Sequence, residues 1–597
     1  MSAASLGSLL PLAVAIPLAG AVVAPLLGRL STRLPVIAAV ASLGGAAAIL
    51  ALQMPLVFRG RLFAHYLGLW TPVRGHALGI VFIAEPFGII YAFACAVVGA
   101  LLLIYTLSEQ GGLGAREFGA NACLFQLLLA ALIGAGLTAD LFNLFVWFEV
   151  AALASYGLTG FYLERPIALE AAFKVVVLTT IASFAVFTGI GLLYASHGAL
   201  NFGQLHSALE PHSALQRHGG LAAALGTADL VALGLLVAGF ATKAGVIPFH
   251  GWLADAHEAA PGPVSALFSG LMVAMGVVAI VRLAFQVYPA GRTVLLGLLM
   301  AVGIASSLVG AVLALAQDDL KRLLAYDTVS QMGLIITGFA TGSAAGIAGA
   351  TYHLVNHALF KPLLFLCAGV ILHRTGMTKL SEMGGLARRM PVVTGAFVVA
   401  VASIAGVPPL NGYVSVNLIH EPLFDSGRFG LYAALLLTQV ITIAALGRAA
   451  WLAFFRRREQ PYDRMERLRP GMLMGFASLG ACCVAFGVVP QFFLDHVMAP
   501  AAASLLHPQR YAHAVLSRSG SLPQLTIPFD YLAPSQLIAI GVSLALGAAL
   551  AWWYLRIREP MPVRALRAAH NGDASDYVAY AVSGLLIVIA VLTMANP

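Results

Sequence analysis

The sequence predicts an all-α polytopic membrane protein with about 16 transmembrane helices, on three observations. Of its 597 residues, 60% are hydrophobic and only 10% are charged. The mean hydropathy is +0.91, whereas soluble domains carry about 25% charged residues. Finally, the chain contains about sixteen runs of roughly 20 mainly apolar residues, which is the length that crosses a bilayer. Little of the chain is left for a soluble domain.

The apolar runs are separated by a few longer connections. The first run, residues 8–27, lacks a basic leader and a small-residue cleavage site, so we expect it to be retained as a helix. A β-rich or looped segment at 58–77 separates the second run from the third, and a polar linker at 201–226 separates the sixth from the seventh. A second polar stretch, 496–534, precedes two last helices that look appended.

The net charge of +8 lies in short loops and predicts orientation, not nucleic-acid binding. Most Lys and Arg residues follow odd-numbered helices, including those of the basic run 456–469. Because cytoplasmic loops are enriched in Lys and Arg, the odd loops are predicted to be cytoplasmic and both termini to lie on the outer side. We expect the membrane to be the cell inner (plasma) membrane.

The sequence contains no pattern that holds a redox centre or a nucleotide. Its five cysteines show no C-x-x-C spacing and fall mostly in apolar runs, which argues against a disulfide framework or an iron–sulfur site. No phosphate loop, nucleophile elbow or dinucleotide fingerprint is present. We therefore expect no cofactor, no metal and no catalytic residue in this chain.

An internal similarity points to two interrupted helices. AGVIPFHG, residues 244–251, and AGVPPLNG, residues 405–412, share five of eight positions. Pro248 in the first, and Pro408 and Pro409 in the second, each remove a backbone hydrogen bond within a helix. Two related bundles of inverted topology, each with a broken helix at a hydrated interior, would explain the pattern. A chance match in a Gly- and Ala-rich chain is the alternative.

Three of the five lysines, Lys174, Lys243 and Lys361, lie inside apolar runs. A lysine at the centre of a membrane helix costs about 2.5 to 3.5 kcal/mol on insertion scales, so it usually faces a cavity or a partner and marks an ion path. Snorkelling toward a helix end is the competing interpretation, and it suits Lys174 better than Lys243.

Glu149, in DLFNLFVWFEVAALASY, is the clearest intramembrane acid. We expect it to pair with Lys243 or Lys174, because a carboxylate close to a lysine keeps both groups charged. Moving the acid away would then release the lysine proton. A static structural ion pair is the alternative.

His353, His357 and Lys361, in ATYHLVNHALFKPLLFL, recur at i, i+4 and i+8 and so share one helix face. Histidine changes charge near neutral pH, so this face can pass protons sideways through waters. Metal binding is disfavoured because Leu354 stands where the metalloprotease pattern needs Glu, and no third ligand is evident. A hydrogen-bonded structural histidine pair remains the other interpretation. Ser330 and Gln331, in DTVSQMG, could hold water.

Taken together, these segments resemble the antiporter-like membrane subunits shared by respiratory complex I, membrane-bound hydrogenases and Mrp-type cation/proton antiporters. The resemblance covers about residues 66–420. It rests on YLGLWTPVRGHALGIVFIAEPFGII, DLFNLFVWFEVAALASYGL, GFATKAGVIPFHGWLADAHEAAPGPVSALFSG, DDLKRLLAYDTVSQMG, YHLVNHALFKPLLFLCAGVILHRTG and SIAGVPPLNGYVS.

The resemblance implies a fourteen-helix core with two inverted five-helix bundles and interrupted helices 7 and 12. It divides the chain into an N-terminal three-helix segment (1–110), a first bundle (111–290), a second bundle (291–456) and C-terminal helices with polar loops (457–597). Glu149 matches the family's fifth-helix glutamate and Lys243 its seventh-helix lysine. Lys174 matches a sixth-helix lysine, and His353, His357 and Lys361 match the central histidines and lysine.

Two positions depart from the family pattern. Ala274 stands where many members have an eighth-helix lysine, and Val416 stands where the twelfth helix usually carries the exit lysine or glutamate. Lys361 could replace the first. His420 and Glu421, about one turn beyond Val416, are the candidate exit residues.

The leading hypothesis is a proton-translocating subunit of a redox-driven or Mrp-type antiporter complex, with other membrane subunits as partners and with protons, and Na⁺ in an antiporter, as the transported ions. The alternative is a non-conducting scaffold with an incomplete proton path, which Val416 and Ala274 favour. A stand-alone solute carrier is a third possibility, but no pocket for an uncharged substrate is legible in the sequence.

Overall fold

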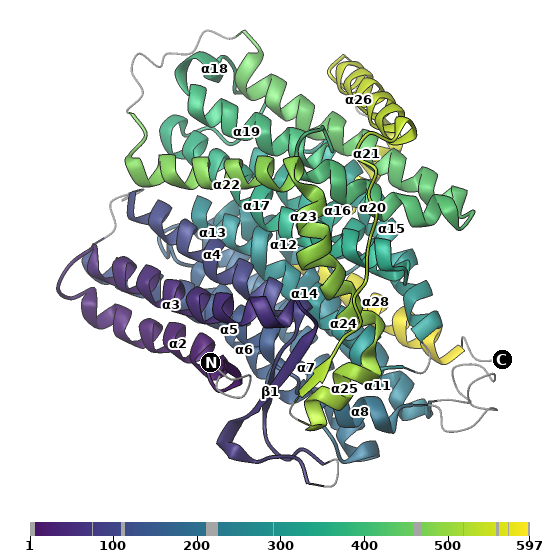
Figure 1. Ribbon diagram of the computed structural model, residues 1–597. Helices are drawn as coiled ribbons and strands as arrows, with labels where there is room; N and C mark the ends of the chain where they lie inside the picture. Colours follow the sequence, from purple (N-terminus) through teal and green to yellow (C-terminus); the bar gives the residue numbers. More distant parts are fainter. Residues whose placement is uncertain are drawn as a thin grey trace.

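The computed structural model describes residues 6–73, 76–108, 114–210, 225–289, 292–457, 467–517, 519–556, 560–570 and 572–594. Within these ranges fifteen helices are long and apolar enough to cross a membrane. They form one bundle (Figure 1). The spans are α2 (Leu10–Leu27), α3 (Leu34–Val57), α4 (Pro86–Ser108), α5 (Ala115–Leu137), α6 (Leu141–Thr159), α7 (Pro166–His197), α11 (Thr227–Ala244), Gly262–Val287, α15 (Arg292–Ala316), α16 (Leu320–Ala340), α17 (Ala344–Thr375), Phe429–Phe455, α22 (Pro470–Val488), α26 (Pro534–Tyr554) and α28 (Ala574–Met594).

Two of these spans contain π-helical turns. Gly262–Val287 is built from α13 (Gly262–Leu267), a π turn (Phe268–Met272), α14 (Val273–Arg282) and a second π turn (Leu283–Val287). Phe429–Phe455 joins α21 (Phe429–Ala450) to a π turn (Trp451–Phe455). Such turns widen a helix by one residue and often occur at functional sites.

A further apolar helix, α19 (Pro391–Ile404), is shorter than a membrane span, so the described residues contain fifteen candidate spans where the sequence predicted about sixteen. It is continued by α20 (Asn411–Asp425) after a break at residues 405–410. The same arrangement occurs at α11, which is followed by a break at residues 245–250 and then by α12 (Gly251–Ala259). The predicted interruptions at Pro248 and at Pro408 and Pro409 are therefore present, whereas the inverted relation of the two halves stays a prediction.

Side chains form hydrogen bonds with backbone carbonyl and N–H groups at the two breaks. The Trp252 indole N–H donates to the carbonyl of Thr242 at 2.7 Å, and the Gln439 amide donates to the carbonyl of Ala405 at 3.2 Å. Ile247 N–H donates to the Ser306 hydroxyl at 3.0 Å. Because no water satisfies lipid-buried backbone groups, irregular backbone at this depth needs such protein partners.

A small antiparallel sheet joins the connection after α3 to the polar stretch before α26. Its strand order is β2 (Val81–Ala84), β1 (Arg61–Tyr66), β3 (Ser519–Ser521). Phe63 pairs with Ala84 on one side and with Ser519 on the other. The β-rich segment at 58–77 was predicted, but its pairing with the second polar stretch was not.

The polar stretches also contain short helices. These are α8 (Phe202–Ala208), α18 (Leu386–Arg389), α23 (Pro490–Phe493), a π turn (Leu494–Met498), α24 (Ala499–Leu506), α25 (Pro508–Ser517) and α27 (Met561–Ala568). The greater part of the predicted linker, residues 211–224, and residues 458–466 of the basic run lie outside the described residues.

The two last helices lie in different places. Helix α26 packs against α21 at the edge of the bundle, whereas α28 packs along α11 beside its break (Figure 1). A Cβ added to Gly584 of α28 would meet the Phe249 ring at 3.1 Å, so the glycine permits this close approach. The helix that looked appended in the sequence therefore covers one of the two interruptions.

Candidate functional site

Lys243 lies in the last turn of α11, directly before the break. Only 1% of the residue is exposed, and its Nζ has no hydrogen-bond partner among the described residues. The ammonium lies 5.1 Å from the centre of the Phe148 ring, a cation–π contact. Gly245, with φ of 65°, ends the helix. The negative end of the helix dipole therefore helps to hold a charge at Lys243.

Glu149, on α6, is half-buried and accepts a hydrogen bond from the Ser183 hydroxyl of α7. Among the described residues it forms no ion pair within 4.0 Å, and its expected pairing with Lys243 or Lys174 stays a prediction. The ring of the preceding residue, Phe148, contacts Lys243 instead, although the charge of Glu149 still acts on that lysine. The arrangement places the acid near the lysine without bonding the two.

Lys174 belongs to a separate ionic network that joins α7, α12 and α16. Its Nζ lies 2.6 Å from Glu170 Oε1 and 3.1 Å from Asp255 Oδ2. Asp255 Oδ1 in turn accepts from Arg322 Nη1 at 2.9 Å, and Arg322 also pairs with Glu258 at 2.6 Å. The i, i+4 spacing of Glu170 and Lys174 is visible in the sequence, but the role of Asp255 was missed.

Lys361, on α17, forms an ion pair with Asp327 of α16, and the two side chains are 0% and 1% exposed. Its Nζ also donates to the carbonyl of Leu324 at 3.0 Å. Sequence reasoning named Ser330 and Gln331 in the same segment but not Asp327. The signal was available, since Asp327 is an acid within a mainly apolar run, about one turn before Ser330.

The central histidines differ in their surroundings. His353 is hydrogen bonded on both sides, with Nδ1 at 2.9 Å from the Ser415 hydroxyl and Nε2 at 2.9 Å from Gln331 Oε1. His357 is fully buried beside the Gly270 backbone, and neither ring nitrogen reaches a described partner with full hydrogen-bond geometry. His353 is thus held in place, whereas His357 retains capacity to exchange protons.

Two further buried histidines, His250 and His257, were not singled out from the sequence. Both follow Pro248, in FHGWLADAH, and no ring nitrogen of either reaches a described partner with full hydrogen-bond geometry. His257 stacks on Phe365 with ring centres 4.6 Å apart, and the charges of Lys321 and Lys361 act on it. It therefore packs against α17, the helix that carries Lys361.

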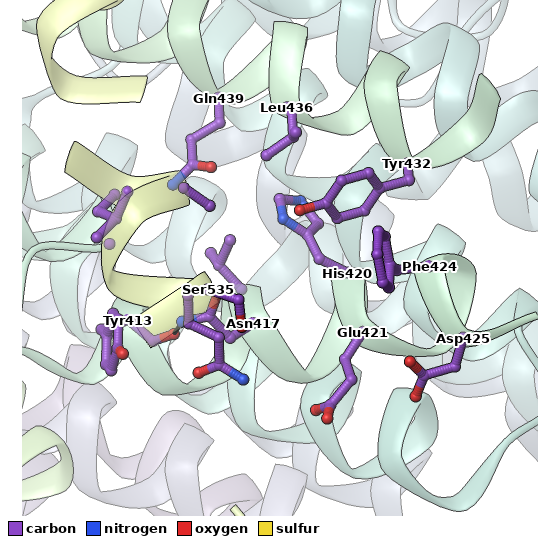
Figure 2. A pocket seen from close by; sticks show the side chains of 15 residues that line it. Tyr413, Asn417, His420, Glu421, Phe424, Asp425, Tyr432, Leu436, Gln439 and Ser535 are labelled. Carbon is purple, nitrogen blue, oxygen red and sulfur yellow. Dashed lines mark hydrogen bonds between the residues drawn. The ribbon is translucent and has the colours of Figure 1, made fainter. Parts of the chain in front are cut away.

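The candidate exit residues line an open cavity of about 210 Å³ between α20, α21 and α26. Figure 2 shows the His420 ring directed toward Tyr432, with the Glu421 and Asp425 carboxylates at the opposite side of the cavity. His420 is 5% exposed and Glu421 is exposed. Val416 lines the same cavity and offers no titratable group. Ala274, on α14, is buried and likewise leaves its position without a charge.

The described residues contain no group of three or more His, Cys, Asp or Glu side chains that could hold a metal ion. The buried basic side chains of the site are Lys243, Lys361, His353 and His357, which were predicted, and His257, which was not. Lys361, His357 and His353 lie along α17, Lys243 lies at the end of α11, and His257 stacks on Phe365 of α17. Buried histidines and lysines whose charges act on one another can exchange protons through intervening waters.

Comparisons with known proteins agree with this geometry. Residues 138–442 match the family described as NADH:quinone oxidoreductase/Mrp antiporter, TM. The chain is 34% identical to NADH-quinone oxidoreductase subunit N of Desulforudis audaxviator, over 82% of this chain and 97% of the relative. It is 30% identical to a subunit of the Na(+)/H(+) antiporter of Bacillus subtilis, over 73% of this chain and 86% of the relative.

Solved structures show the same likeness. A chain of the Mrp complex from Dietzia sp. superposes with a TM-score of 0.76 at 28% identity, covering 86% of this chain and all of that chain. A chain of an archaeal membrane-bound sulfane sulfur reductase superposes with a TM-score of 0.75 at 26% identity, covering 85% of this chain and all of that chain.

Proposed function

The chain belongs to the NADH:quinone oxidoreductase/Mrp antiporter family, and from this premise we propose that it is a proton-translocating, antiporter-like subunit of a multi-subunit membrane complex. The observation that carries the proposal is the buried series of basic side chains from Lys243 to His353. A purely structural protein has no use for so many buried titratable groups, because each costs several kcal/mol to bury unpaired.

The proton path follows from the contacts of these groups. Lys243 takes up a proton beside the break of α11, and His257, which stacks on α17, would carry it on to the Lys361–Asp327 pair. His357 then receives the proton and passes it to His353, which Ser415 and Gln331 hold in position. The cavity that His420 and Glu421 line offers the exit.

Glu149 sets the proton affinity of Lys243. Because the two groups interact by charge without a direct bond, a small movement of α6 changes the attraction that keeps the lysine protonated. The Ser183 hydroxyl holds the carboxylate in its present position. Glu149 would be the point at which a neighbouring subunit acts on the path.

The partners are other membrane subunits. The named relatives are subunits of a quinone oxidoreductase and of a Na(+)/H(+) antiporter, and the solved neighbours belong to an Mrp complex and a respiratory membrane complex. The drive would thus come either from electron transfer elsewhere in the complex or from exchange for Na⁺. The cell plasma membrane, with both termini on the outer side, is the location that the basic loops favour.

The test is proton uptake by sealed vesicles that hold the native complex, energised by its own electron donor or by a Na⁺ gradient. Lys243→Ala should abolish the flux while the complex stays assembled. Lys379→Ala, at an exposed loop lysine, is the matched control and should leave the flux unchanged. Comparing the two energy sources also separates a redox-driven complex from an antiporter.

Val416 supports one alternative, a scaffold subunit with an incomplete path. It occupies the exit cavity with a side chain that cannot carry a proton. In that case Lys243→Ala would leave proton flux intact in an assembled complex, and the subunit would serve only to dock its partners.

A further inference from the structure

The segment between α26 and α28 lies over the break of α11. His570, which follows α27, places its ring centre 4.9 Å from that of His250 and 6.2 Å from that of Tyr326. His250 and Tyr326 are themselves 6.4 Å apart. The three rings thus form one cluster, to which the C-terminal segment contributes the half-buried member.

The two imidazoles are equipped for proton transfer. His570 Nδ1 donates to the carbonyl of Leu566 at 2.8 Å, which leaves Nε2 as the basic nitrogen. Burial lowers the pKa of His570, so the ring is mostly neutral at pH 7 and releases an acquired proton readily. His250 is 3% exposed, and neither of its nitrogens reaches a described partner with full hydrogen-bond geometry.

The ionic network of Lys174, Asp255 and Arg322 lies next to the segment that carries His570. A Cβ added to Gly572 would lie 3.7 Å from Lys174 Nζ and 3.9 Å from Asp255 Oδ2. Arg322 binds Asp255 from α16, so the ionic network lies beside the histidine pair. Tyr580, on α28, donates to the carbonyl of Ala569 at 3.0 Å and fixes the turn that carries His570.

His250 and Lys243 flank the break of α11, because α11 ends at Ala244 and α12 begins at Gly251. Only the broken backbone of residues 245–250 separates Lys243 from His250 along the chain, and His570 contacts His250 from the other side of that segment. The Trp252 indole closes the same break by donating to Thr242. No other described histidine ring contacts His250.

We propose that His570 is the proton-uptake residue of this chain, passing protons from the surface to His250 at the break of α11 and thereby to Lys243. In each cycle Nε2 of His570 takes a proton from a hydronium ion, leaving water, and gives it to the unprotonated ring nitrogen of His250. His250 then gives a proton to the unprotonated amine of Lys243, and both imidazoles return to their neutral forms. The inference rests on the proposed function. The C-terminal segment is on this account part of the transport path.

The test is proton flux in vesicles holding the native complex with His570→Asn. The asparagine amide can still donate to the carbonyl of Leu566, so the turn is kept while the basic nitrogen is lost. We expect flux to fall about tenfold, less than the 10²- to 10⁴-fold typical of a positioned proton-transfer group, because water offers a slower bypass. Added imidazole should restore much of the loss.

His513→Asn is the matched control, because His513 is exposed on α25 and also bonds through Nδ1, to the Ser517 hydroxyl at 3.0 Å. This variant should leave proton flux unchanged, and added imidazole should not alter its flux. If His570→Asn fails to assemble, His250→Asn interrupts the same transfer at its accepting end and should lower flux to a similar extent.

Three outcomes overturn the inference in a wild-type complex that does pump: unchanged flux in His570→Asn, a loss that imidazole does not restore, or unchanged flux in His250→Asn. A wild-type complex that moves no protons would instead refute the proposed function. The two failures are therefore distinguishable within one experiment.

Discussion

The Lys361–Asp327 pair provides the sharpest energetic prediction. Asp327→Asn removes the only carboxylate within 4.0 Å of Lys361 among the described residues and leaves the ammonium with the carbonyl of Leu324. Both side chains are almost fully buried. Removing one partner of a buried ion pair costs about 3 to 5 kcal/mol, because the remaining charge is uncompensated.

Deprotonation of Lys361 limits this cost. A lysine with the reference pKa of about 10.4 can be neutralised at pH 7 for roughly 4.6 kcal/mol, at 1.36 kcal/mol per pH unit. The loss therefore cannot much exceed ~5 kcal/mol, since the lysine would release its proton instead. With an unfolding entropy of about 2.1 cal/mol/K per residue, 597 residues give roughly 1.25 kcal/mol/K, so Tm should fall by about 2 to 4 °C.

Thermal unfolding of the purified complex, followed for the single variants and for the double variant Asp327→Leu with Lys361→Met, measures this cost. The double variant should recover most of the lost stability, because two apolar side chains of similar size need no partner. A single variant as stable as the wild type, or a double variant as unstable as the single, would refute the reasoning.

Other sites give three further predictions. Burial raises the pKa of Asp140, at the start of α6, to about 6. The folded protein therefore favours protonated Asp140, and the stability that this protonation contributes is lost as the pH rises from about 4 through 6. Asp140→Asn should therefore stabilise the protein at pH 7 by up to about 3 kcal/mol, but not at pH 4. Thermal unfolding at both pH values measures the difference. Glu85→Ala leaves the fully buried Arg282 without its ion-pair partner and should cost about 3 to 5 kcal/mol in the same assay, whereas an unchanged Tm would show that backbone carbonyls suffice. His420→Asn should slow proton release severalfold in vesicle flux measurements; equal flux would exclude the cavity at α20 as the exit.

The membrane fold and the two broken helices could be predicted from the sequence because their signals are local. Apolar runs of spanning length mark the helices, and Pro248, Pro408 and Pro409 mark the interruptions. The i, i+4, i+8 spacing likewise placed His353, His357 and Lys361 on one helix, α17. None of these inferences required knowledge of which helices are neighbours.

Pairings between helices could not be predicted in this way. Asp327 and Asp255 are the partners of Lys361 and Lys174, and neither lies near its lysine in sequence. Glu149 could not be assigned to one lysine from the sequence, because charge complementarity alone makes every buried acid a candidate partner. The sheet that joins residues 61–66 to 519–521 was missed because pairing between strands so far apart in the sequence leaves no local signal.

The contact between His570 and His250 is also a pairing between distant segments that the sequence could not predict. The sequence shows a polar connection before the last helix, and nothing local indicates that it folds back over the break of α11. Packing of α28 along α11, which Gly584 permits, brings the two histidines together.

Proton flux in sealed vesicles, compared between the wild-type complex and His357→Ala, tests the central claim most directly. His357 lies in the middle of the buried series and has no ionic partner among the described residues whose loss would unfold the site. The account predicts that flux collapses while the complex remains assembled and its other subunits remain active. Undiminished flux in an assembled His357→Ala complex would contradict it.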